Sequence, residues 1–136
     1  MIELLVVIGI LAVCSVGATA VLAKSRARSV LSTEASRFAD TLLETQHMAI
    51  TAQQGKTWAI SCSGSTWQRY GYTEEIPDPT PEIHTFDGRM HCTASAPEIR
   101  FHKLTGMPES PITFTLSLDG TAVISVSQVG TVTVTQ

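Results

Sequence analysis

The chain has 136 residues, enough for one domain with an N-terminal anchor but not for two independent hydrophobic cores. Charged residues make up 15% of the sequence and the formal net charge is −3, so nothing attracts the chain as a whole to nucleic acid. No Gly-x-Ser-x-Gly elbow, phosphate-binding loop or Ser-His-Asp set occurs in a suitable context, and we therefore expect no enzyme and no cofactor.

The chain begins with an apolar segment. Leu4 to Ala23 carries no formal charge, and a helix of that length rises about 30 Å, the thickness of the hydrocarbon core of a bilayer. A cleaved signal peptide is the alternative, but its basic residues would precede the apolar run, whereas here Glu3 precedes it and Lys24 follows it. We therefore expect residues 1–23 to be retained as a single transmembrane segment.

The charges around this segment leave its orientation ambiguous. The basic residues Lys24, Arg26 and Arg28 would lie in the cytoplasm by the positive-inside tendency. Cys62 and Cys92 indicate the opposite side for the rest of the chain, because two cysteines pair in an oxidising compartment. We expect the C-terminal part to be extracytoplasmic.

Residues 24–55 continue the helix with a one-sided pattern. Apolar residues recur there at spacings of three and four, as a helix with one buried face requires. They are Ala27, Val30, Leu31, Ala35, Phe38, Ala39, Leu42, Leu43, Ala49 and Ile50. No proline occurs before Pro77, and Gly55 is the first residue expected to end the helix. The sequence therefore predicts one helix of about 50 residues, roughly 75 Å long.

Residues 56–136 have the two-residue period of β-strands. We predict strands at 57–62, 98–104, 112–118, 121–127 and 131–135. Asp119-Gly120 is a hairpin signal, whereas the proline-rich stretch 74–81 should be an exposed loop that pairs poorly. The predicted fold class is α+β, with one long N-terminal helix packed on a small antiparallel β-sheet head.

Two of the cysteines are expected to form a disulfide in this head. Linking Cys62 and Cys92 would close a loop of about 30 residues, worth roughly 3–4 kcal/mol in the chain-entropy model. The alternative is two buried free thiols. The four histidines have no metal-ligand spacing, so we expect surface histidines and no metal site.

The segment Ile2-Glu3-Leu4-Leu5-Val6-Val7-Ile8 resembles the N-terminus of mature type IV pilins and type II secretion pseudopilins, two positions inside the usual mature start. In that family a prepilin peptidase removes a leader, the new amine is methylated, and a glutamate pairs with the terminal amine of a neighbouring subunit. The resemblance therefore implies filament assembly from inner-membrane lipid. The residues that it assigns to assembly are Glu3, Ile2, Leu4 and Leu5.

The head resembles GspH/FimT-type minor pseudopilins through Ile99-Arg100-Phe101, Leu104-Thr105-Gly106 and the strands at 112–118 and 126–134. This resemblance implies a long helix against two small antiparallel sheets. It also implies a minor subunit of a secretion filament or pilus, located in the bacterial inner membrane with its head in the periplasm or an extracellular filament. Other pilin or pseudopilin subunits would be its partners.

Three alternatives stay open. The chain could be a major pilin of the filament shaft, or a solitary anchored domain that never polymerises. The third is a DNA-binding minor pilin of an uptake pilus, for which Arg100 and Lys103 are the candidate contacts. Because Lys103 is the last basic residue of the chain, we expect nucleic acid to be a less favoured partner.

Overall fold

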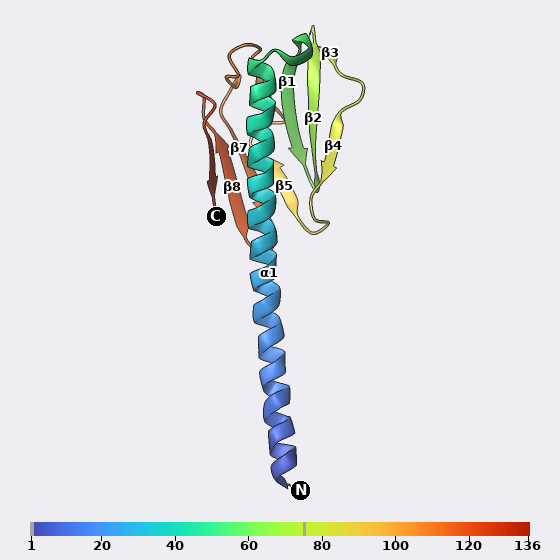
Figure 1. Ribbon diagram of the computed structural model, residues 1–136, viewed down its shortest axis with the longest axis vertical. Helices are drawn as coiled ribbons and strands as arrows, with labels where there is room; N and C mark the ends of the chain where they lie inside the picture. Colours follow the sequence, from blue (N-terminus) through green and yellow to red (C-terminus); the bar gives the residue numbers. More distant parts are fainter. Residues whose placement is uncertain (1, 75) are drawn as a thin grey trace.

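The protein is one long helix that carries a β-rich head at its C-terminal end, as the computed structural model shows (Figure 1). The structure describes residues 2–74 and 76–136, without the side chains of residues 2–5, 10–20 and 53. Helix α1 spans Ile2–Ile50, and the 3₁₀ turn η1 spans Gln53–Gly55. The strands are β1 (Thr57–Ser63), β2 (Thr66–Thr73), β3 (Ile76–Pro77), β4 (Glu82–Thr85), β5 (His91–Ala94), β6 (Ile99–Phe101), β7 (Ile112–Ser117), β8 (Thr121–Val126) and β9 (Val132–Thr135).

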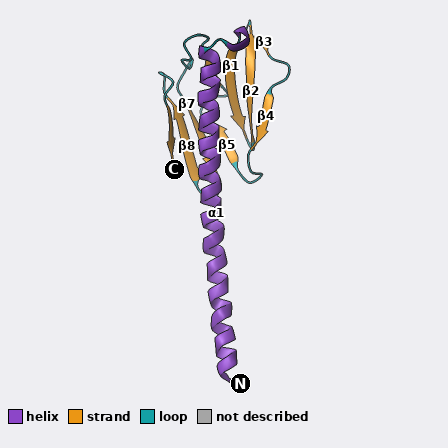
Figure 2. Ribbon diagram, viewed as in Figure 1, coloured by secondary structure: helices purple, strands orange, loops and turns teal. Residues whose placement is uncertain are grey.

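The strands form two antiparallel sheets beside the C-terminal half of α1 (Figure 2). The first sheet has the order β3-β2-β1-β6, with β4 also paired to β2, and the second has the order β5-β7-β8-β9. The α+β architecture is therefore confirmed, and the two small sheets agree with the resemblance to minor pseudopilins.

The helix ends at Ile50 and not near Gly55, where the sequence predicts its end. The backbone N–H of Leu104 donates to the carbonyl of Ala49 at 2.9 Å, so the β6–β7 loop satisfies a carbonyl that a longer helix would have bonded internally. Ala52 then takes a left-handed conformation, with φ of 48°, and turns the chain toward β1. The left-handed Ala52 and the contact from Leu104 thus coincide at the end of α1.

One face of α1 supplies much of the hydrophobic core. Its buried apolar residues are Ala27, Leu31, Ala35, Phe38, Ala39, Leu42 and Ala49. The prediction was wrong for Leu43 and Ile50, which are 47% and 44% exposed. Leu42, Thr45 and Ala49 already fill the buried face, and Leu43 lies about 100° around the helix from Leu42. Thr45 is buried despite its hydroxyl, because that hydroxyl donates to the Thr41 carbonyl at 2.7 Å.

The strand predictions are correct for β7, β8 and β9 of the second sheet and incomplete elsewhere. The hairpin of β7 and β8 forms as predicted, whereas the strand predicted at 98–104 is shorter, at β6. Residues 74–81 were expected to be an exposed loop that pairs poorly, and among those described Ile76–Pro77 forms the short exposed strand β3. It joins the edge of β2, where the missing N–H of Pro77 costs no ladder hydrogen bond. The strands β2, β4 and β5 were missed.

The predicted disulfide is present and joins the two sheets. Cys62 lies in β1 and Cys92 in β5, with their Cα atoms 6.1 Å apart. The backbone N–H of Cys92 also donates to the Gly64 carbonyl at 2.6 Å, so hydrogen bonding and a covalent link coincide at this junction.

Within the described residues, no helical stretch has both the length and the hydropathy required to cross a membrane. The transmembrane segment predicted at residues 1–23 includes residues 10–20, whose side chains lie outside the described part, so it stays a prediction.

Candidate assembly surface

The first half of α1 projects away from the head, as Figure 1 shows. Five of its described side chains are large, apolar and more than half exposed, with Val21 the most exposed at 71%. They are Val6, Val7, Ile8, Val21 and Leu22. Exposed apolar area of this extent is unfavourable in water, at about 25 cal/mol per Å². The described apolar side chains of this projecting half are therefore not covered by the head of the same chain.

The four residues predicted to act in assembly lie at the far end of the projecting half. Ile2, Glu3, Leu4 and Leu5 form the first turn of α1, but their side chains lie outside the described residues. Ala27 is the first buried apolar residue of the helix among the described ones, so Glu3 lies about 36 Å from the head along the helix axis. At this distance, any partner of the Glu3 carboxylate has to come from outside the head of its own chain.

A hollow of about 480 Å³ lies where the helix enters the head, and we call it the neck hollow. Residues 22–30 of α1, the loop between β4 and β5, and the turn between β7 and β8 line it. The lining residues are Leu22, Ala23, Arg26, Ala27, Val30, Asp87, Arg89, Leu118 and Asp119. The lining of the hollow thus combines five apolar residues with two charges of each sign.

Arg69 ties the helix to the first sheet. Its guanidinium donates to Glu44 of α1 at 2.9 Å and to Glu82 of β4 at 2.8 Å. The hydrogen bond with His84, at 2.9 Å, and those from Arg69 hold the pKa of Glu82 below its ordinary value. Arg69 therefore links α1 to β4 through ion pairs at the surface of the head.

A second polar cluster lies on β2 and β6. The carboxylate of Glu98 accepts hydrogen bonds from the hydroxyls of Tyr70 and Tyr72 and from the guanidinium of Arg100. Burial acts to raise the pKa of Glu98, but the hydrogen bonds from Tyr70, Arg100 and Tyr72 outweigh it, and the pKa lies below its ordinary value. Burial and the neighbouring carboxylate raise the pKa of Tyr70 in turn.

Arg100 and Lys103, the candidate nucleic-acid contacts, differ in their surroundings. Arg100 donates to Glu98 and stacks over the ring of Tyr72 at 4.3 Å, so its charge is already compensated. Lys103 is exposed in the loop after β6 and makes no ion pair with a described residue. The structure therefore does not bring two free cations together here. The Tyr-x-Tyr and Glu-x-Arg spacings, each on one face of a strand, were the sequence signal for this cluster.

Replacing Glu98 by glutamine is expected to destabilise the protein at pH 7 by about 1–2 kcal/mol, because charge-assisted hydrogen bonds are lost. A carboxylate whose pKa is lower in the folded protein than in the unfolded chain stabilises the fold at pH values above its unfolded pKa, near 4.5. This contribution disappears as the pH falls through the folded pKa. The difference between wild type and Glu98→Gln should therefore shrink between pH 7 and pH 3.

Urea unfolding of both proteins at several pH values measures this difference. Glu109→Gln is the control, since Glu109 is exposed and makes no ion pair with a described residue, and it should change little at any pH. A Glu98→Gln effect that is the same at pH 7 and pH 3 would contradict the assigned role of the carboxylate.

No metal site is evident in the part of the chain that the structure describes, where no three His, Cys, Asp or Glu side chains are grouped to hold an ion.

Comparison with known proteins identifies solved structures that share this fold. No family model and no curated protein matches the sequence. Solved structures do match, among them two of the minor pseudopilin EpsH from the type 2 secretion system of Vibrio cholerae, at 15% and 13% identity. The TM-scores are 0.62 and 0.63, over 77% and 78% of this chain and 95% and 93% of those chains. The chain therefore shares the fold of a minor pseudopilin, which confirms the resemblance at the level of fold.

Proposed function

We propose that this chain is a structural subunit of a type II secretion or type IV pilus-like filament, in the role of a minor, GspH/FimT-like pseudopilin. The observation that carries the proposal is the projecting half of α1, with apolar side chains exposed beyond the head. The shared fold with two minor pseudopilin structures supports it. The protein acts by assembly and not by catalysis.

The projecting half serves two environments in this proposal. Before assembly, residues 1–23 lie in the inner membrane, where lipid covers their apolar side chains. In the filament, the apolar faces of neighbouring helices replace the lipid. The head stays on the periplasmic or extracellular side, in agreement with the Cys62–Cys92 disulfide. Each subunit uses different surfaces toward the next, as an open-ended filament requires.

Glu3 sets the register of assembly by pairing with the terminal amine of a neighbour. Replacing it by alanine is expected to reduce the chain recovered in filaments about tenfold or more, because breaking a buried ion pair costs about 3–5 kcal/mol. Membrane insertion should not fall, because the substitution removes a charge at the edge of lipid. Quantifying the chain in sheared filaments and in membranes measures both quantities.

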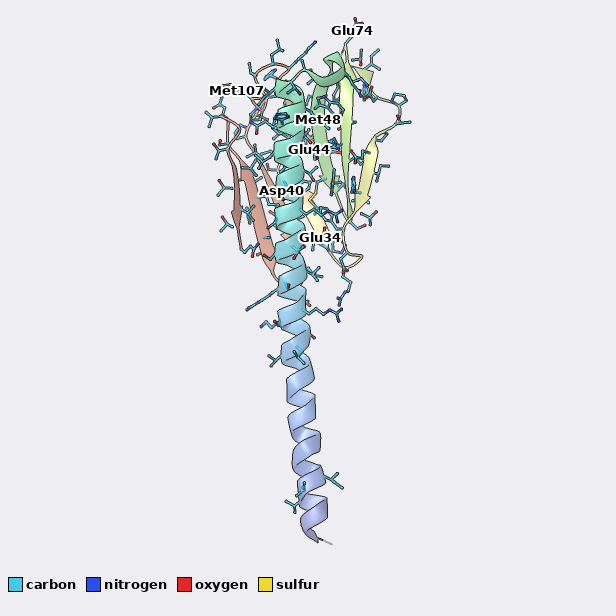
Figure 3. The ribbon with its side chains drawn as sticks, viewed as in Figure 1. Glu34, Asp40, Glu44, Met48, Glu74 and Met107 are labelled. Atoms are coloured by element: carbon cyan, nitrogen blue, oxygen red, sulfur yellow. A yellow bond between two sulfur atoms is a disulfide. The ribbon has the colours of Figure 1, made fainter. Side chains whose placement is uncertain are left out.

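Glu34→Ala is the matched control, since Glu34 lies on the same helix beside the head (Figure 3) and makes no ion pair with a described residue. It should enter filaments like the wild type. Normal incorporation of Glu3→Ala would contradict the register role.

The minor role is distinguished from a major pilin by abundance. A minor subunit should be recovered in filaments far below the level of the main subunit, and equal or higher recovery would favour the major pilin. No observation favours the DNA-binding alternative, because Arg100 is held by Glu98 and Tyr72.

A further inference from the structure

Four basic side chains surround α1 where the helix enters the head, and we call them the basic collar. Lys24, Arg26 and Arg28 lie on α1, and Arg89 lies in the loop between β4 and β5. All four are exposed, and none makes an ion pair with a described residue. Lys24 and Arg28 are about one helical turn apart, whereas Arg26 lies about 160° around the helix from both. The basic collar therefore presents cations on opposite sides of α1.

The fold brings Arg89 to the level of Arg26 at the end of the head nearest the projecting half, which we call the base. The β4–β5 loop lies at this end (Figure 1), and Arg89 lines the neck hollow together with Arg26. Asp87 and Asp119 line it too, so the charges of the hollow itself balance. Arg28 lines a second hollow, of about 410 Å³, beside the β7–β8 turn. With the whole basic collar, the base carries four cations against two carboxylates.

This base is basic in a chain that is acidic as a whole. The formal net charge of the chain is −3, and the residues outside the base include five basic and ten acidic ones. The next charged residue along α1, Glu34, lies about 9 Å beyond Arg28 along the helix axis. Positive charge is therefore concentrated at one level of the molecule, directly beside the projecting half.

In the proposed membrane-anchored state, the basic collar lies at the depth of the lipid headgroups. Residues 24–28 span about 6 Å along α1, and the polar region of a bilayer adds about 5–8 Å on each side of its hydrocarbon core. On the N-terminal side of this level, Val21 and Leu22 are 71% and 68% exposed. Leu22 lines the same hollow as Arg26. Apolar side chains followed by cations match the order of acyl chain and phosphate in a phospholipid, which a soluble anion or an acidic peptide does not have.

We propose that the basic collar binds the headgroups of anionic phospholipids in the leaflet next to the head. The proposal rests on the proposed function and adds a class of ligand to it. An extracytoplasmic head places these cations at the end of the membrane segment where basic residues are disfavoured, and anionic lipid at that level compensates them. The guanidiniums of Arg26 and Arg89 donate paired hydrogen bonds to a phosphate, while an acyl chain lies along Leu22. The base of the head then rests on the membrane surface.

A photo-crosslinking residue at position 88 in the full chain tests this contact in vesicles. Gly88 lies next to Arg89, and a side chain built there meets no atom within 4 Å. The vesicles are phosphatidylcholine with phosphatidylglycerol as a minor component, and mass spectrometry identifies the crosslinked lipids. Relative to its abundance, phosphatidylglycerol should be enriched about fivefold over phosphatidylcholine. The enrichment should disappear at about 1 M salt, because exposed charges are then screened. Met107, exposed near the far end of α1 (Figure 3), is the control position and should give no lipid adduct.

The variant Arg26→Gln/Arg89→Gln is expected to lower the enrichment at position 88 to about twofold or less, because two of the four cations are lost. It should leave lipid adducts from Val7 in the projecting half unchanged. Arg37→Gln/Lys103→Gln is the matched control, since it removes the same charge from exposed residues outside the base, and it should keep the full enrichment.

Three results would overturn lipid binding by the basic collar while Val7 still crosslinks to lipid. The first is adducts at position 88 in proportion to lipid abundance, and the second is no lipid adduct there. The third is a crosslink from position 88 to another protein in place of lipid, in cells that cannot assemble filaments. Absence of lipid adducts from Val7 as well would overturn the membrane-anchored state in the proposed function.

Discussion

Replacing Phe38 by alanine is expected to lower the free energy of unfolding by about 3–5 kcal/mol. The ring is 1% exposed and meets three other rings, with centroids 5.8 Å from Trp67, 5.8 Å from Phe86 and 5.1 Å from Phe114. Trp67 belongs to the first sheet and Phe114 to the second. One helix residue thus joins α1 to both sheets, and its removal leaves a cavity where the three elements meet.

Urea unfolding of the full chain in detergent measures this loss. Leu43→Ala is the matched control on the same helix, because Leu43 is largely outside the core and should cost no more than about 0.5 kcal/mol. A similar small loss for both variants would show that α1 is not anchored to the head through Phe38.

Removing the disulfide is expected to cost about 3–4 kcal/mol, because the bond closes a loop between residues 30 apart in the sequence. The double variant Cys62→Ala/Cys92→Ala avoids placing hydroxyls at buried positions. The head then keeps its strand pairing but loses the covalent link between its two sheets. Urea midpoints of the variant and of the wild type give the difference.

A reducing agent provides an internal control for the disulfide. It should lower the stability of the wild type to that of the double variant and leave the variant unchanged. Equal stability of oxidised and reduced wild type would show that the bond does not constrain the unfolded chain.

These two features bear on function because they fix the head to one half of the helix only. Phe38 of α1 packs against the sheets, and Arg69 of β2 pairs with Glu44 of α1. Among the described residues, no residue before Ala27 is buried. The projecting half is therefore free to contact lipid or other subunits while the head keeps its shape.

Local signals in the sequence predict much of this fold. The helix follows from an unbroken run without proline, and β7 and β8 follow from strict alternation around Asp119-Gly120. The disulfide was predictable because only two cysteines lie in the head. In each case the information lies within a few residues or in the chemistry of one residue type.

Tertiary contacts determine what the sequence did not reveal. The strand β2 was missed because its half-buried polar residues, such as Arg69 and Tyr70, find their partners on other strands and on α1. The helix end is bonded by Leu104, distant in sequence, and the exposure of Leu43 depends on how the sheets pack against α1.

Photo-crosslinking from Val7 shows most directly whether the projecting half of α1 packs against other subunits. Val7 is 55% exposed, and the head lies about 30 Å away along the helix, so its own chain offers no nearby partner among the described residues. We expect crosslinks to the helix of this or another pilin-like subunit in purified filaments. The proposed function would be contradicted if Val7 crosslinks only to lipid and the filaments that the cells assemble do not contain this chain.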